Sequence, residues 1–171
     1  MNNDLIAVLA NLALALSLIV AIIFGIVEVR IAARDRKERL TLEELRNFQS
    51  REFAELVNHI TRSTMVSTMQ EFNALPANER INYIQFGQEM ESLGLLVAEK
   101  LIDIDLVDRT LGSLVITSWV KYKAVFTDMR EKQPDPFLGE YFQWLAERLD
   151  ERMSKNPRKP YYLTEVSEAE R

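Results

Sequence analysis

The feature that most constrains this chain is an uncharged segment near its N-terminus. No Asp, Glu, Lys or Arg occurs from Leu5 to Val27. As an α-helix, these roughly 23 residues would extend for about 35 Å, which exceeds the ~30 Å hydrocarbon core of a bilayer. We therefore predict a transmembrane helix with a short external N-terminus over residues 1–28. A chain of 171 residues leaves room for one modest further domain.

A cleaved signal peptide is the competing interpretation of this segment. Signal peptides begin with basic residues, continue with an apolar stretch of roughly 7–15 residues and end in a small-residue cleavage site. Residues 1–4 carry no basic side chain, the apolar stretch is longer, and a helical pattern continues beyond Arg30. These features favour a helix that stays in the membrane.

Five basic side chains follow the predicted span, in a juxtamembrane stalk at residues 29–40. They are Arg30, Arg34, Arg36, Lys37 and Arg39, here called the basic collar. Lys and Arg beside a span remain on the cytoplasmic side. We therefore expect an inner (cytoplasmic) membrane protein with its N-terminus outside and its C-terminal domain in the cytosol. The collar could also bind anionic lipid headgroups. The general topology rule favours the simpler interpretation, in which the collar only fixes the orientation of the membrane helix.

Small side chains recur along one face of the membrane helix. Ala13, Ser17, Ala21 and Gly25 are spaced four apart, and Asn11 lies at the edge of the same face. Helices in lipid associate through close backbone approach across small residues and through shared polar groups. The face predicts self-association. Two alternatives remain open. The pattern could arise by chance, because alanine is common in membrane helices, or the face could pack on a different protein.

The apolar periodicity of residues 41–153 is helical, and we find no strand pattern and no repeat. This predicts an all-α fold in which a small cytosolic bundle of four or five helices follows the membrane helix. Thr41 and Glu44 have capping-box spacing. They either begin a short helix or lie within one long helix that continues out of the membrane. Residues 154–171 are polar and rich in Pro and Glu, so we expect a mostly disordered tail.

Local signals place the ends of the predicted helices in the bundle. Ser50 caps a helix that carries Phe53, Leu56, Val57 and Ile60 on one face and that breaks in the Ser/Thr-rich segment after it. Another helix runs from about Glu79 to Lys100. Asp105 caps a helix that ends near Lys132, and Asp135 followed by Pro136 begins the last one.

Apolar stripes on these helices predict the core. On the helix at 79–100 the stripe includes Gly87 and Gly94, whose spacing suggests a groove for a neighbouring helix. Trp119 lies at the centre of the stripe on the least charged helix. The full set of stripe residues is Tyr83, Gly87, Met90, Gly94, Val97, Leu101, Leu111, Leu114, Val115, Trp119, Tyr122, Phe126, Met129, Leu138, Phe142, Leu145, Leu149 and Met153.

Several of these helix and core segments also carry a family resemblance. They are Leu45-Arg46-Asn47-Phe48, Glu89-Met90-Glu91-Ser92-Leu93-Gly94-Leu95-Leu96-Val97, Leu101-Ile102-Asp103, Trp119 and Phe142-Gln143-Trp144-Leu145-Ala146-Glu147-Arg148-Leu149. The chain resembles a bacterial family of small membrane-anchored helical proteins catalogued as a domain of unknown function. The resemblance covers roughly residues 5–149 and carries no catalytic motif. It implies a bacterial inner-membrane protein without an assigned activity.

The residue types needed for catalysis or metal binding are scarce. The chain has no Cys and a single His, His59, so thiol chemistry and paired-histidine metal sites are excluded. Glu55 could share a metal with His59 one helical turn away. The simpler interpretation is that His59 is an ordinary surface or core residue and not a ligand. Asp103, Asp105 and Asp108 lack the glycine and glutamate of a calcium loop, so helix capping explains them better. We predict no enzyme, cofactor or metal.

The charge balance indicates which partners to expect. From Leu40 onward there are 16 Lys/Arg and 22 Asp/Glu, and a net-acidic domain is a poor default binder of nucleic acid. The expected partners are the lipid bilayer, a second copy and an unidentified protein. The favoured function is a membrane-anchored, non-enzymatic interaction or regulatory module. The alternative is an oligomeric membrane effector of the toxin or phage-defence type.

Overall fold

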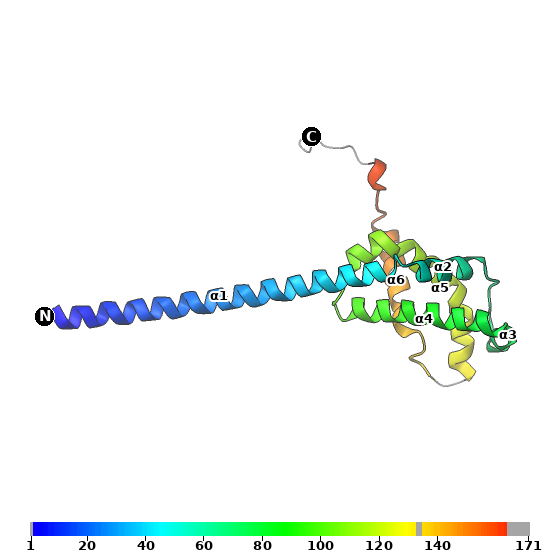
Figure 1. Ribbon diagram of the computed structural model, residues 1–171, viewed down its shortest axis with the longest axis horizontal. Helices are drawn as coiled ribbons and strands as arrows, with labels where there is room; N and C mark the ends of the chain where they lie inside the picture. Colours follow the sequence, from blue (N-terminus) through cyan, green and yellow to red (C-terminus); the bar gives the residue numbers. More distant parts are fainter. Residues whose placement is uncertain (1, 133–134, 164–171) are drawn as a thin grey trace. The chain divides into compact units, whose positions relative to one another are not determined.

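The computed structural model describes residues 2–132 and 135–163, and in these residues all regular structure is helical (Figure 1). The elements are α1 (Asn2–Asn47), α2 (Arg51–Arg62), α3 (Met69–Ala74), α4 (Ala77–Ala98), α5 (Ile104–Lys132), α6 (Glu140–Lys155) and the 3-10 turn η1 (Tyr161–Leu163). The predicted fold class is confirmed, since one long apolar helix precedes a set of shorter helices.

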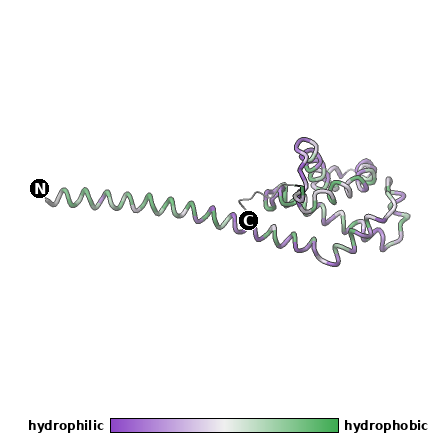
Figure 2. The backbone as a smooth tube through the Cα atoms, turned by 90° about the horizontal axis from the view of Figure 1, so that it is seen from above, coloured by the Kyte–Doolittle hydropathy of each residue, from purple (hydrophilic) through white to green (hydrophobic). Residues whose placement is uncertain are grey.

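The chain divides into two compact units, residues 1–43 and 44–171. In the first unit every described side chain from Leu5 to Arg36 is exposed, and the hydropathy colouring of α1 is mostly apolar over its first half (Figure 2). In the described part of the chain, α1 is the single helix long and apolar enough to cross a membrane. It is therefore a candidate membrane span.

The length of α1 shows that Thr41 and Glu44 lie within one long helix and do not begin a separate short one. The helix runs without a break to Asn47, so neither residue begins a separate helix. The Thr41 hydroxyl donates to the carbonyl oxygen of Lys37 at 2.8 Å. A Ser or Thr inside a helix can satisfy its hydroxyl in this way, by bonding back to the preceding turn.

The start of α2 and the break after it match the sequence prediction. The Ser50 side chain accepts a hydrogen bond from the backbone N–H of Phe53 at 3.1 Å, as an N-cap should. Phe53, Leu56 and Ile60 are buried. The helix ends at Arg62, and Thr68 caps the short helix α3 that follows.

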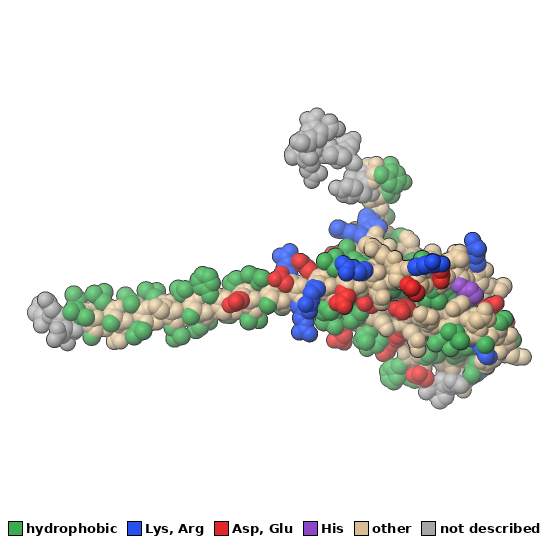
Figure 3. Space-filling view, viewed as in Figure 1, with side chains coloured by type: hydrophobic (Ala, Val, Ile, Leu, Met, Phe, Trp, Pro, Cys, Tyr) green, Lys and Arg blue, Asp and Glu red, His purple; other side chains and the backbone are tan. Residues whose placement is uncertain are grey.

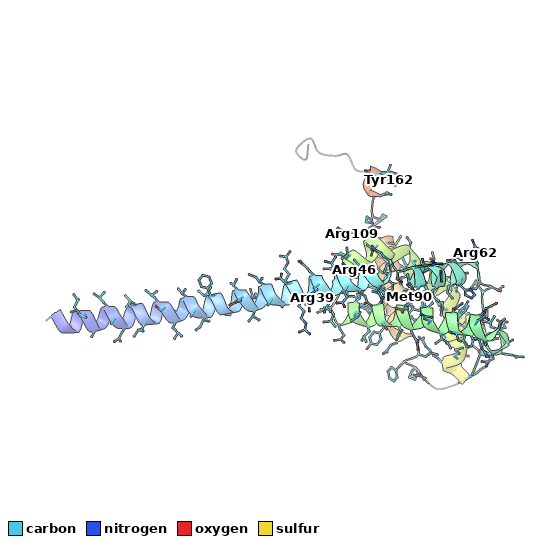
Figure 4. The ribbon with its side chains drawn as sticks, in the orientation of Figure 1. Arg39, Arg46, Arg62, Met90, Arg109 and Tyr162 are labelled. Atoms are coloured by element: carbon cyan, nitrogen blue, oxygen red, sulfur yellow. The ribbon has the colours of Figure 1, made fainter. Side chains whose placement is uncertain are left out.

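The core of the second unit lies among α4, α5 and α6. Helix α6 packs against both of the others, and α2 packs on α4. Met90 lies inside this bundle, whereas Arg62 and Arg109 lie on its surface (Figure 4). Among the described residues, the largest fully buried side chains are Tyr122, Phe86, Phe142, Met90, Leu93, Leu145, Leu149, Val107, Val115 and Val125.

Trp119 belongs to this core, as predicted. It is 6% exposed, and its ring meets the rings of Phe142 and Phe126 in edge-to-face contacts with centroids 5.1 and 6.0 Å apart. Such arrangements are the preferred geometry for aromatic pairs. The aromatic residues of α5 therefore form part of the packed interior.

Two predicted core residues at helix ends are exposed instead. Leu101 is 44% exposed because α4 stops before it: Lys100 adopts a left-handed φ of 59°, and the N–H groups of Leu101 and Ile102 turn back to donate to Leu96. Ile102 is buried in place of Leu101. Met153, in the last turns of α6, is also 44% exposed.

Helix α5 begins two residues before its predicted start. Asp103, not Asp105, is the cap, because its side chain accepts from the backbone N–H of Asp105 at 2.8 Å and its carbonyl accepts from Leu106 and Val107. Asp105 lies in the first turn and pairs with Arg152 of α6. The prediction of a capping aspartate was right in kind and wrong in position.

The prediction that α6 begins at Pro136 is wrong, since the helix begins at Glu140. Asp135 instead accepts from the N–H of Phe137 at 3.1 Å within a turn, while residues 133–134 lie outside the described part. The residue before α6 is Gly139, with a left-handed φ of 68°. This conformation suits glycine, so Gly139 precedes α6 and does not lie inside a helix that starts at Pro136.

A side chain from α4 takes over the capping of α6. The Glu91 carboxylate accepts from the backbone N–H of Tyr141 at 3.2 Å and from that of Phe142 at 2.9 Å. The first N–H groups of a helix have no partner within it, and negative charge is favourable there. The N-terminus of α6 is therefore held by a residue about fifty positions earlier in the chain.

Helix α5 holds the connection between α2 and α3 in the same manner. The Lys121 ammonium donates to the carbonyl oxygens of Ile60, Thr61 and Ser63 at 2.7, 2.8 and 3.0 Å. Two turns later, Asp128 accepts from the backbone N–H of Met69 at 2.7 Å. A cation thus meets the C-terminus of one helix and an anion the N-terminus of the next, which is the favourable sign at each end.

The tail is helical for longer than predicted. Helix α6 continues to Lys155, two residues past the predicted domain boundary, and residues 161–163 form η1. Residues 164–171, which belong to the predicted disordered tail, lie outside the described part of the chain.

Candidate functional site

The predicted association face lies wholly on the exposed part of α1. Ala13, Ser17, Ala21, Gly25 and Asn11 are all exposed. The Ser17 hydroxyl donates to the carbonyl oxygen of Ala13 at 2.8 Å, so it is satisfied within its own helix. A Cβ on Gly25 would meet no atom within 4 Å. Self-association through this face stays a prediction.

The basic collar is partly neutralised by acidic neighbours on the same helix. Arg34 forms an ion pair with Glu38 at 2.9 Å, and the hydrogen bond and charge of Glu38 raise the pKa of Arg34. In the described part of the chain, Arg30, Arg36 and Arg39 form no ion pair. Lys37 is partly buried. Three arginines of the collar are thus exposed without an acidic partner among the described residues. Figure 3 shows basic and acidic side chains gathered along this stretch of α1.

A polar cleft of about 750 Å³ lies between α2 and α4 and contains His59. Glu55, the possible metal partner of His59, instead accepts from Arg51 at 2.7 Å. The Nε2 atom of His59 is buried and has no hydrogen-bond partner among the described residues. No group of three or more His, Asp or Glu side chains in the described part of the chain could hold a metal ion.

A second, mostly apolar pocket of about 240 Å³ lies within the bundle, between α3, α4, α5 and the turn before α6. We call it the aromatic pocket because four of its side chains are ring systems. Its lining consists of Phe72, Tyr83, Ile84, Gly87, Gln88, Glu91, Tyr122, Val125, Phe126, Met129, Leu138 and Gly139. No local sequence pattern marks this pocket, since its walls come from segments far apart in the chain.

The rings of the aromatic pocket contact one another in series. Phe72 meets Tyr83 edge-on with centroids 6.2 Å apart, Tyr83 meets Tyr122 at 4.9 Å, and Tyr122 meets Phe126 edge-on at 5.4 Å. The pocket is therefore walled by ring surfaces rather than by hydrogen-bonding groups.

The polar atoms of the aromatic pocket are mostly engaged within the protein. The Tyr122 hydroxyl donates to the carbonyl oxygen of Tyr83 at 2.9 Å. Burial raises the pKa of both tyrosines, so both hydroxyls keep their protons at neutral pH. Glu91 accepts from the two N–H groups of α6 described above. The exposed Gln88, by contrast, forms no side-chain hydrogen bond in the described part of the chain.

The two glycines of α4 have different surroundings. A Cβ on Gly94 would lie 2.3 Å from the carbonyl oxygen of Tyr141, so α6 passes against α4 at this point. A Cβ on Gly87 would meet only ring atoms of Tyr122 and Phe126, at 3.5 and 3.6 Å, which are ordinary contact distances. The predicted helix groove is therefore correct for Gly94, whereas Gly87 faces the aromatic pocket.

These features define a class of protein: an all-helical chain with one candidate membrane span and a compact helical domain. The chain belongs to the family described as Domain of unknown function (DUF4760), which matches residues 9–149. The match covers most of α1 and nearly all of the bundle. No curated protein and no solved structure matches the chain.

Proposed function

We propose that this protein is a membrane-anchored, non-enzymatic interaction or regulatory module. The observation that carries the proposal is the exposed, uncharged segment of α1 from Leu5 to Val27, on a chain whose second unit buries its own core. So long an apolar surface needs a nonpolar environment, and a helix of this length matches a bilayer. The second unit is then held at the membrane surface.

The proposed orientation places the N-terminus outside and the helical domain in the cytosol, at an inner membrane. The basic collar supports this orientation through the tendency of Lys and Arg to remain on the cytoplasmic side. The unpaired Arg30, Arg36 and Arg39 are available to anionic headgroups. The acidic balance of the domain makes another protein a more plausible partner than nucleic acid.

A reporter fused after Arg171 tests the orientation. We expect activity from a reporter that matures only in the cytosol and none from one that matures only outside it. Neutralising all five collar residues should give mixed orientations. The matched control neutralises five exposed cations of the second unit, Arg62, Arg109, Lys123, Arg158 and Lys159, and should leave the orientation unchanged. Activity of the external reporter on the wild type would overturn the proposed topology.

Leakage from vesicles separates the module from the alternative of a membrane effector. The purified full chain is reconstituted into vesicles of phosphatidylethanolamine and phosphatidylglycerol that contain a trapped dye. An anchored module should release no more dye than a protein-free preparation. Release that rises with protein concentration would favour the effector and contradict the proposal.

A further inference from the structure

Gly87 poses a physical problem that Gly94 does not. A glycine inside a helix carries a stability cost relative to alanine. At Gly94 the cost has a structural reason, since the backbone of Tyr141 occupies the space a side chain would need. At Gly87 a methyl group would fit at ordinary contact distance, so packing gives no reason for glycine. The missing side chain of Gly87 instead leaves space within the aromatic pocket, which Gly87 lines.

The size of the aromatic pocket suits a small organic group. Its volume is about 240 Å³, whereas an engineered apolar cavity of about 150 Å³ is large enough to bind benzene. Ile84, which lines the pocket, is 50% exposed. The pocket therefore has an apolar border at the protein surface.

The lining indicates the chemistry of the ligand. The rings of Phe72, Tyr83, Tyr122 and Phe126 favour edge-to-face or offset contacts with another aromatic ring, and the Met129 thioether is favourable at a ring edge. The Tyr122 hydroxyl and the Glu91 carboxylate are already engaged. A charged ligand would lose its hydration without gaining a dedicated partner, whereas Gln88 can hydrogen-bond one polar substituent at the border.

We propose that the aromatic pocket binds a compact, uncharged aromatic molecule of one or two rings, over the space that Gly87 leaves open. The ring lies between the side chains of α4 and those of α5, and a single N–H or O–H group reaches Gln88. This binding site is independent of the proposed membrane role, since every residue that forms it belongs to the second unit.

Photolabelling of the full chain in lipid nanodiscs tests the proposal. The probe is phenyl trifluoromethyl diazirine, an uncharged single-ring compound. We expect label on peptides from α4 and α5 that contain Gly87 and Phe126, and an excess of indole should compete it away. In Gly87→Leu the added side chain fills the pocket, and this label should fall about tenfold, which corresponds to about 1.4 kcal/mol of binding.

Label on α1 is the internal control, because the probe also dissolves in lipid. It should be equal in the wild type and the variant and should resist indole, and its absence would count against the membrane anchor without affecting the pocket. If circular dichroism shows that Gly87→Leu is unfolded, the labelling is compared with Gly87→Ala instead. This variant should fold, because its methyl group meets the neighbouring rings at ordinary contact distance. Two results would overturn the proposal. One is that the wild type carries no label on α4 and α5; the other is that this label is unchanged in whichever Gly87 variant folds.

Discussion

The apolar half of α1 and the helices of the second unit obey different rules. From Leu5 to Val27 no side chain is buried within the protein, and the helix needs only its own backbone hydrogen bonds. In the second unit, helix ends rely on other helices: Glu91 caps α6, and Lys121 and Asp128 hold the ends of α2 and α3. A change in the first region should therefore act locally, whereas one in the second should spread through the bundle.

Trp119→Ala should cause the largest loss of stability. Deleting a large buried aromatic side chain typically costs about 3–5 kcal/mol, and Trp119 supports both Phe126 and Phe142. Denaturant unfolding of the full chain in detergent, followed by circular dichroism, measures the effect. Trp144→Ala is the matched control, because Trp144 is 36% exposed and its removal should cost far less. Equal costs for the two changes would contradict the assignment of Trp119 to the core.

Substitution by alanine should destabilise the protein at Gly94 but not at Gly87. Gly94→Ala places a methyl group against the Tyr141 carbonyl and should destabilise the bundle by about 1–3 kcal/mol, as overpacked sites do. Gly87→Ala should be neutral or should stabilise by up to about 1 kcal/mol, the difference in helix propensity. The same unfolding measurement compares them. A stable Gly94→Ala protein would show that α6 does not approach α4 as described.

Glu91→Ala tests whether capping from another helix matters. Loss of a helix cap costs about 0.5–2 kcal/mol, and here the N–H groups of Tyr141 and Phe142 both lose their acceptor. Hydrogen exchange at these two amides should speed up in the variant. Glu89→Ala is the control, since Glu89 forms no side-chain hydrogen bond in the described part of the chain, and its effect should be small. Unchanged exchange in Glu91→Ala would exclude the cap.

Asp128 should make the attachment of α3 sensitive to acid. Hydrogen bonds from Lys132 and from the Met69 N–H lower the pKa of Asp128 in the folded protein. Because the pKa of Asp128 is lower in the folded than in the unfolded protein, its ionised carboxylate stabilises the fold at pH values above the unfolded pKa of about 4. This stabilisation disappears as the pH falls through the pKa of the folded protein. The stability difference between wild type and Asp128→Asn should therefore shrink from pH 7 to pH 3. A difference that grows on acidification would have the wrong sign.

Changes on the small-residue face of α1 should leave the bundle unaffected. Ser17→Leu combined with Ala21→Leu would separate two helices that associate there, while unfolding of the second unit should stay at its wild-type value. Crosslinking in membranes measures association, and Leu18 and Ile22 changed to Ala, two positions outside the face, serve as the control. Equal crosslinking of the wild type and the leucine variant would exclude this face as an interface.

Short-range chemistry accounts for what could be predicted. Ser50 caps α2 through a side chain three residues from its partner, and the stripe from Tyr83 to Val97 follows from helical period alone. The predictions that failed depend on distant residues or on unusual backbone. Nothing near Pro136 reveals that Glu91 will cap α6 at Glu140, and nothing near Lys100 reveals that it will adopt a positive φ.

The sequence by itself determined the candidate membrane span, the helical class and most of the core, because charge distribution and apolar period act within one segment. Only the tertiary structure decided where α6 begins, which charged side chains hold the ends of α2 and α3, and that Gly87 opens onto a pocket while Gly94 lies against α6. The physical reason is common to all three: each depends on atoms from another helix, about 30 to 60 residues away in the chain, that only packing brings within contact distance.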